Sequence, residues 1–93
     1  MIVGFITVQL RIPMARSLKD RRNVLRSLTD KIDNKFNVAV AEVNSSGQWK
    51  NTSLAVVTVG GEKKQVEQCL NNVLKFIDEF PGVFAVQTQI EYY

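Results

Sequence analysis

Two features of this sequence limit its possible chemistry: the absence of histidine and the concentration of positive charge in one segment. The chain has no His, so the commonest general base near neutral pH and the commonest metal ligand are absent. Its single Cys cannot by itself build a zinc site. We therefore predict no catalytic residue, no metal site and no cofactor. Positions 11 to 35 hold eight Lys or Arg and three Asp, a net charge of +5, whereas the remainder holds four basic and six acidic residues. Positive charge concentrated in this way can contact the phosphates of RNA.

Five basic residues are the candidates for such phosphate contacts: Arg11, Arg16, Lys19, Arg22 and Arg26. At 100° per residue the last three share one exposed face of a predicted helix, which Asp30 and Asp33 continue with opposite charge. Two interpretations stay open. Either the face is neutralised internally, above all by Arg26 with Asp30, or its N-terminal half binds RNA.

Arg21 differs from these residues because its helical angle points toward the apolar side of the same helix. It could extend outward to solvent along its apolar stem, or it could pair with an acidic group such as Glu42. Cys69 is expected on the apolar face of a second helix as a buried, inert thiol. Trp49 could stack on a base, but packing over the sheet edge is favoured.

Periodicity predicts the elements that must position these side chains. Alternation of apolar and polar residues indicates strands at 2–12 and from 84 onward, the last of them apolar on one side only. Runs of β-branched or small apolar residues indicate strands at 37–43 and 52–59, and the run at 54–57 is apolar on both faces, which suits a central strand. Ser17, with Asp20 three residues later, has the pattern of a helix cap, and the apolar repeat after it is helical. A second amphipathic helix is predicted over about 62–79, ended by Pro81-Gly82.

The order strand, helix, strand, strand, helix, strand predicts one α+β domain over residues 1–93. Two right-handed crossovers joined by a hairpin give a ferredoxin-like βαββαβ fold, with a four-stranded antiparallel sheet ordered 4-1-3-2 and both helices on one face. The other face is open. On it we expect Val3, Phe5, Thr7, Gln9, Arg11, Gln87, Gln89 and Glu91, a mixed surface suited to binding a protein partner or to forming a homodimer.

Several runs of residues resemble one bacterial family. They are Met1-Ile2-Val3-Gly4, Arg11-Ile12-Pro13, Ala15-Arg16-Ser17-Leu18-Lys19-Asp20-Arg21-Arg22, Phe36-Asn37-Val38, Val40-Ala41-Glu42-Val43 and Trp49. On these residues the chain resembles the YlxP-like family, a domain of unknown function, strongly over about the first 60 positions. Two features depart from the family pattern: Gly60-Gly61 replaces a more polar helix entry, and Arg21 stands where Lys is more usual.

The resemblance implies a ferredoxin-like fold in a bacterial cytoplasmic protein, commonly encoded beside translation initiation and ribosome maturation factors. It supplies no established activity. Taken with the local positive charge, it leads us to expect a noncatalytic factor that binds RNA or a ribosome-associated protein. The alternative is an interaction or dimerisation module that uses the open sheet face. The sequence has no segment apolar and long enough for a membrane span, and we expect a cytoplasmic protein.

Overall fold

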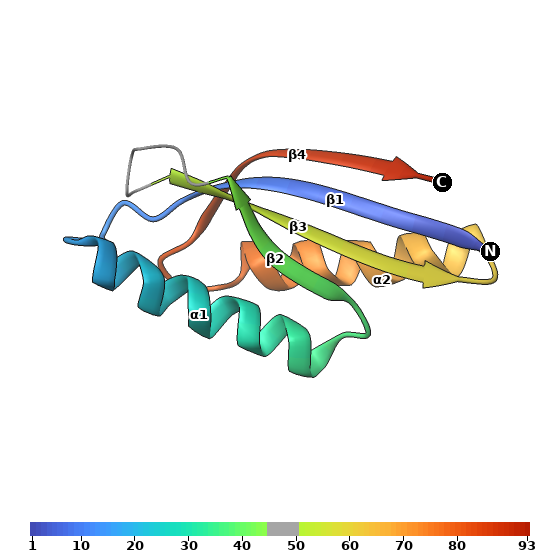
Figure 1. Ribbon diagram of the computed structural model, residues 1–93, viewed down its shortest axis with the longest axis horizontal. Coiled ribbons are helices and arrows are strands. Elements are labelled where there is room, and N and C mark those ends of the chain that lie inside the picture. Colours follow the sequence, from blue (N-terminus) through green and yellow to red (C-terminus); the bar gives the residue numbers. More distant parts are fainter. Residues whose placement is uncertain (45–50) are drawn as a thin grey trace.

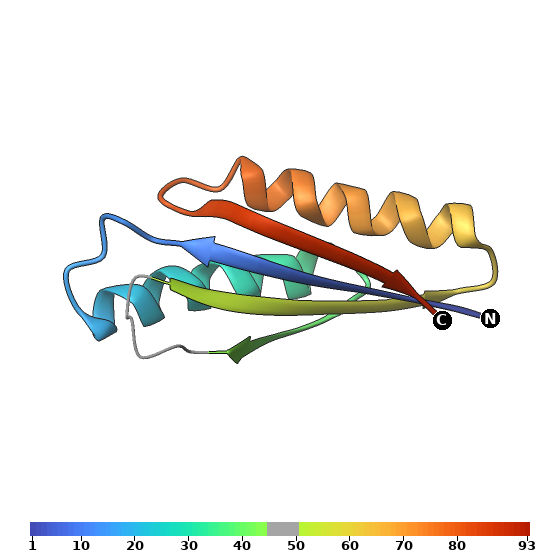
Figure 2. The ribbon, with the colours of Figure 1, turned by 90° about the horizontal axis from the view of Figure 1, so that it is seen from above.

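The computed structural model describes residues 1–44 and 51–93. Its elements follow the predicted order: β1 (Ile2–Arg11), α1 (Leu18–Lys35), β2 (Ala39–Asn44), β3 (Asn51–Gly60), α2 (Lys63–Asp78) and β4 (Phe84–Tyr92). The strands form one antiparallel sheet in the order β2-β3-β1-β4, which is the predicted order taken from the other edge. Both helices cover one face of this sheet (Figure 1, Figure 2), so the predicted ferredoxin-like fold is confirmed.

The core lies between the sheet and the two helices. β1 directs alternate side chains to the helices, and Ile6, Val8 and Leu10 are almost completely buried there, as the period of two along a strand requires. β3 lies between β1 and β2, which explains why the sequence predicts apolar residues on both of its faces. The helices complete the core with buried residues at helical spacing: Leu25, Leu28 and Ile32 from α1, and Val66, Leu70, Val73 and Ile77 from α2.

Gly4 lets α2 approach β1 closely. A Cβ atom built on this residue would lie 2.4 Å from Val66 Cγ1 and 2.7 Å from Leu70 Cδ1, well inside van der Waals contact. Only glycine leaves the space that these two side chains occupy. The close packing of α2 on the sheet therefore requires a residue without a Cβ atom at position 4.

β4 differs from the predicted one-sided strand. All its residues from Phe84 to Glu91 are exposed, including Val86 at 57% and Ile90 at 41%. Pairing between β1 and β4 shifts register between Gln9 and Leu10, so one extra residue of β4 is inserted there. Because α2 packs mainly against β3 and β1, the edge strand is left with little cover.

Three smaller expectations can be compared with the structure. Cys69 is half-buried rather than fully buried, because it sits at the flank of the apolar face of α2. Neither helix, within the part of the chain that the structure describes, is long and apolar enough to cross a membrane. Trp49 and residues 45–48 of the expected hairpin loop lie outside the described residues.

Candidate nucleic-acid interface

The start of α1 is held by the cap that the sequence predicts. The Ser17 hydroxyl accepts a hydrogen bond from the backbone N–H of Asp20 at 3.1 Å. The Asp20 carboxylate in turn accepts one from the backbone N–H of Arg16, also at 3.1 Å. This reciprocal cap satisfies N–H groups that a helix end otherwise leaves unpaired. It fixes the backbone of Arg16 relative to the first turn of the helix.

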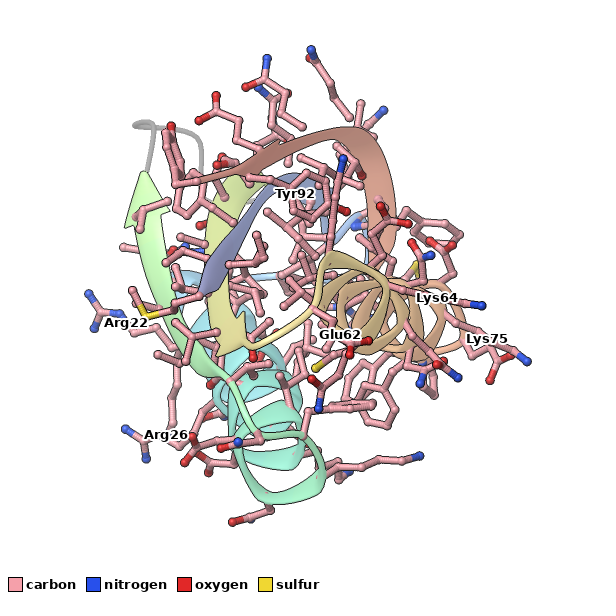
Figure 3. All side chains as sticks on the ribbon, turned by 90° about the vertical axis from the view of Figure 1, so that its right-hand side faces the viewer. Arg22, Arg26, Glu62, Lys64, Lys75 and Tyr92 are labelled. Atoms are coloured by element: carbon pink, nitrogen blue, oxygen red, sulfur yellow. The ribbon has the colours of Figure 1, made fainter. Side chains whose placement is uncertain are left out.

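Three cations follow on one side of α1, and with Arg16 we call them the basic stripe: Arg16, Lys19, Arg22 and Arg26. All four are exposed. Figure 3 shows Arg22 and Arg26 pointing away from the core on the side where β2 lies. From Lys19 to Arg26 the helix rises about 10.5 Å. The stripe is therefore long enough to span several phosphates of a nucleic-acid strand, which are about 3.4 Å apart along the axis in double-stranded DNA.

The stripe is not neutralised by its own helix. Among the described residues the ion pairs are Arg21 with Glu42 and Lys63 with Glu67, and none involves the stripe. The pairing of Arg26 with Asp30, which one of the two interpretations requires, is therefore not formed. Of the two interpretations of this face, internal neutralisation loses its main contact.

Arg11 lies apart from the stripe. It shares the open side of β1 with Gln9, opposite Asn51 on β3 and Phe84 on β4, whereas the stripe belongs to the helix layer. Arg11 lines a hollow of about 370 Å³ together with Gln9, Leu10, Asn51, Thr52, Ser53 and Val86. The five residues predicted to bind RNA thus occupy two surfaces.

Lys31 and Lys35, which add to the charge of the same segment, also lie off the stripe. The Lys35 ammonium is 5.0 Å from the ring centre of Phe76 on α2, and that of Lys31 is 5.3 Å from the ring centre of Phe80, just after the end of α2. Such contacts with aromatic rings are attractive. These lysines serve the packing between the helices, so the net charge of the segment overstates the charge of the stripe.

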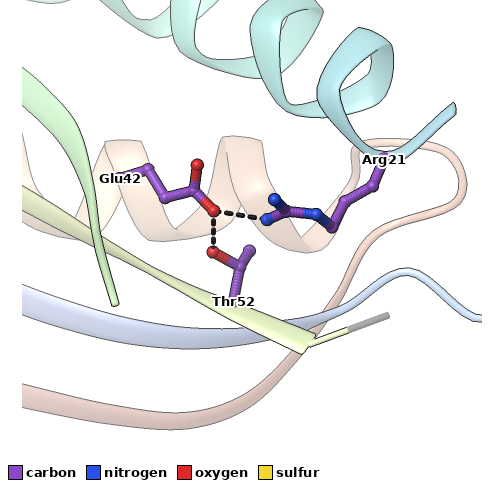
Figure 4. Close-up of polar contacts among 3 residues, drawn as sticks. All are labelled: Arg21, Glu42 and Thr52. Carbon is purple, nitrogen blue, oxygen red and sulfur yellow. Dashed lines mark hydrogen bonds and ion pairs between the residues drawn. The ribbon is translucent and has the colours of Figure 1, made fainter. Parts of the chain in front are cut away.

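Arg21 anchors α1 to the sheet (Figure 4). The residue is 5% exposed, and its Nη1 lies 2.5 Å from Oε2 of Glu42 on β2. The hydroxyl of Thr52 on β3 donates to the same carboxylate oxygen. Arg21 Nε is buried without a hydrogen-bond partner among the described residues. The pairing with Glu42, one of two alternatives left by the sequence, is the one formed.

The Glu42 carboxylate stays ionised because its partners outweigh its burial. Burial alone raises its pKa, but the hydrogen bonds from Thr52 and Arg21 lower it, and the charges of Arg21 and Arg22 lower it further, so that the pKa lies below its usual value. One cation of the stripe, Arg22, thus also acts on this anchor. The anchor and the stripe share the same turn of α1.

The predicted interface residues do share the open face. Register places Phe5 opposite Glu91, Thr7 opposite Gln89 and Gln9 opposite Gln87, with Val3 two residues before Phe5. The sequence prediction missed the share of this face that comes from the other two strands. Val43 of β2 and Val59 of β3 are 52% and 58% exposed, and both extend the apolar part of the face. Val59 follows buried Thr58, and this alternation along β3 was a signal available in the sequence.

Comparison with known proteins adds a family to this geometry. A family model described as "Protein of unknown function (DUF503)" matches residues 3–90. The uncharacterized protein YlxP of Bacillus subtilis (strain 168) is 35% identical over 92 residues, which cover 99% of this chain and 100% of that protein.

Solved structures are similar in fold alone. The protein YJCS has a TM-score of 0.60 at 11% identity, with 96% of each chain covered. SnoaB, a cofactor-independent oxygenase from Streptomyces nogalater, has a TM-score of 0.54 at 7% identity, with 99% of this chain and 90% of that chain covered. Many unrelated functions use this fold, so the arguments about function must come from the site.

Proposed function

We propose a function for this chain, which belongs to the DUF503 family of proteins of unknown function, as its resemblance to the YlxP-like family predicted. It is a noncatalytic factor that binds structured RNA or a ribonucleoprotein through the basic stripe. The proposal places it in translation or ribosome maturation. The observation that carries it is the set of exposed cations on α1 that lack ion-pair partners among the described residues.

The stripe suits the sugar-phosphate backbone rather than the bases. Arginine and lysine on a helix contact phosphates through charge-assisted hydrogen bonds, which position a protein but carry no sequence information. Recognition of single bases in this fold commonly uses aromatic rings on the two central strands. Here β1 and β3 carry only Phe5. We therefore expect recognition of RNA shape, with Arg11 reached only by an RNA that bends round the end of the sheet.

The test is fluorescence anisotropy of the purified protein with a labelled ribosomal RNA fragment. We expect binding that weakens with salt, with a slope of log K against log salt of about −3 for four phosphate contacts. The variant Arg22→Glu, Arg26→Glu should lose at least tenfold in affinity and have a shallower slope. Binding that is absent, or insensitive to salt, contradicts the proposal.

A matched control is available on α2. The variant Lys64→Glu, Lys75→Glu reverses the same number of charges, and Figure 3 shows both lysines pointing away from the side that carries Arg22 and Arg26. Its affinity should stay within about threefold of the wild type, since long-range charge effects are screened beyond about 10 Å at 0.1 M salt. Equal losses in the two variants would mean that net charge, and not the stripe, drives binding.

A second candidate function is an interaction or dimerisation module that uses the open sheet face. The observation that favours it is the apolar part of that face, where Val43 and Val59 are exposed beside half-buried Val3 and Phe5. This candidate requires a second copy to cover Phe5. It predicts that Phe5→Asp gives a monomer by size-exclusion chromatography with light scattering, and an unchanged mass would count against it.

A further inference from the structure

The two edges of the sheet are protected to different degrees. β2 is the shorter edge, with six residues, and it directs the charged Glu42 toward the helix side, where Arg21 holds it. Short length and an inward charge are known protections against pairing with another chain. β4 has nine residues, Phe84–Tyr92, without Pro, Lys or Arg. Its bulge lies near its start, at Val86, so that the strand is regular from Gln87 onward. In Figure 1 it forms the upper margin of the sheet, and its edge is available for pairing.

The hydrogen-bonding groups of β4 that are not used by β1 can be identified from the register. Val3 and Tyr93 exchange both backbone hydrogen bonds, at 2.9 and 2.8 Å. In an antiparallel pair such positions alternate with positions that exchange none. Counting from Val3, the positions that exchange no hydrogen bonds include Ile6 with Ile90 and Val8 with Thr88. Thr88 and Ile90 therefore direct their N–H and C=O groups away from β1, toward the free edge.

The residues around Thr88 are arranged so that the strand can pair with itself. The run Val86-Gln87-Thr88-Gln89-Ile90 has nearly the same pattern in both directions. When two copies pair in antiparallel fashion with Thr88 opposite Thr88, Val86 lies opposite Ile90 and Gln87 lies opposite Gln89. The amides then meet on the open side, which is a favourable cross-strand pair. Ile90 comes next to Val86, the residue inserted where the register between β1 and β4 shifts.

We propose that β4 pairs with β4 of a second copy of this chain about a two-fold axis at Thr88, which joins two four-stranded sheets into one of eight strands. The contact is isologous, because each residue of the edge meets the symmetry-related position of the other copy. It covers Val86 and Ile90, which are 57% and 41% exposed in the single chain. It goes beyond the proposed binding of RNA and uses an edge rather than the open face.

Cross-linking at the two-fold axis tests the pairing. Thr88→Cys in a Cys69→Ser background brings two thiols together at a hydrogen-bonded antiparallel pair, where Cα atoms are about 5.5 Å apart and a disulfide can close. Under mild oxidation we expect a disulfide-linked dimer. The matched control is Ile90→Cys in the same background: its copies lie four residues apart along the strands, about 13 Å, so it should not cross-link by itself.

A second variant removes the edge without touching the bonds to β1. Thr88→Pro deletes an N–H that points to the free edge, and Pro is tolerated in an edge strand at such a position. With an unchanged circular dichroism spectrum, it should have half the wild-type mass by light scattering. Phe5→Asp, on the open face, should remain dimeric.

Three results would overturn the proposal. The first is a wild-type protein that is monomeric at about 100 μM, a concentration well above typical dissociation constants of specific dimers. The second is cross-linking of Ile90→Cys alone as readily as Thr88→Cys. The third is a dimer that survives Thr88→Pro but is lost in Phe5→Asp. The last result would assign dimerisation to the open face.

Discussion

Removing the carboxylate of Glu42 should destabilise the protein through Arg21 rather than through Glu42 itself. The Arg21 side chain is 6% exposed and that of Glu42 is 34% exposed, so Glu42→Ala leaves a buried guanidinium without its counter-ion. Breaking a buried pair from one side costs about 3–5 kcal/mol. Because water can reach the Glu42 end of the pair, we expect a cost somewhat below that range, about 2–3 kcal/mol. For a chain of this size the midpoint of thermal unfolding should fall by about 10–20 °C.

A double-mutant cycle separates the pair from its surroundings. Arg21→Met removes the buried charge and leaves Glu42 partly solvated, so it should cost about 1 kcal/mol. The double variant Arg21→Met, Glu42→Ala should lie within about 1 kcal/mol of the wild type, because neither charge is then left without its partner. The coupling energy should then be about 2 kcal/mol, within the usual range for residues in contact.

The assay is urea unfolding followed by circular dichroism, with equal m-values required for each comparison. The reasoning would be refuted by additive single substitutions, meaning a coupling energy under about 0.5 kcal/mol, which is the scatter expected of independent sites. It would also fail if Glu42→Ala were as stable as the wild type. Either outcome would show that the guanidinium reaches water without its partner.

Two further predictions concern the pH dependence of the free energy of unfolding and the packing of α2 on β1. The pKa of Glu42 is lower in the folded state. Its contribution to the free energy of unfolding is therefore fully present above the unfolded pKa of about 4.3 and is lost as the pH falls through the folded pKa. Glu42→Gln should remove this part of the pH dependence of stability, measured by urea unfolding between pH 7 and pH 3. Gly4→Ala, whose Cβ would lie 2.4 Å from Val66 Cγ1, should cost about 1–3 kcal/mol. Gly61→Ala, with nothing within 4 Å, is its control and should leave the midpoint of urea unfolding nearly unchanged.

Features set by neighbouring residues were predictable from the sequence. The cap at Ser17 and Asp20 depends on residues three apart, and the face shared by Lys19, Arg22 and Arg26 depends only on the period of the helix. The strand order followed from the handedness of the crossovers. These are local or topological constraints, and the structure agrees with each of them.

Features that depend on distant residues were left open or were wrong. Arg21 and Glu42 are 21 positions apart, and nothing in either neighbourhood selects pairing over solvation. The exposure of Val86 depends on how far α2 extends over the sheet and on an inserted residue in β4, neither of which alters the alternation of the strand. One local alternative was also left open: the contact of Arg26 with Asp30 fits the helical spacing but is not formed, because exposed pairs of this kind gain little free energy.

The pairing of β1 also bears on how the chain folds. Phe5 is 52 positions from its β3 partner Val57 and 86 positions from its β4 partner Glu91. Closing the longer loop directly costs only about 0.4 kcal/mol more in chain entropy, but during synthesis its far end emerges last. A nascent chain can therefore form β2, β3 and β1 before β4 exists. Until then the outer edge of β1 is open, and β4 of another chain could occupy it, which makes strand exchange a hazard of slow synthesis and of high local concentration.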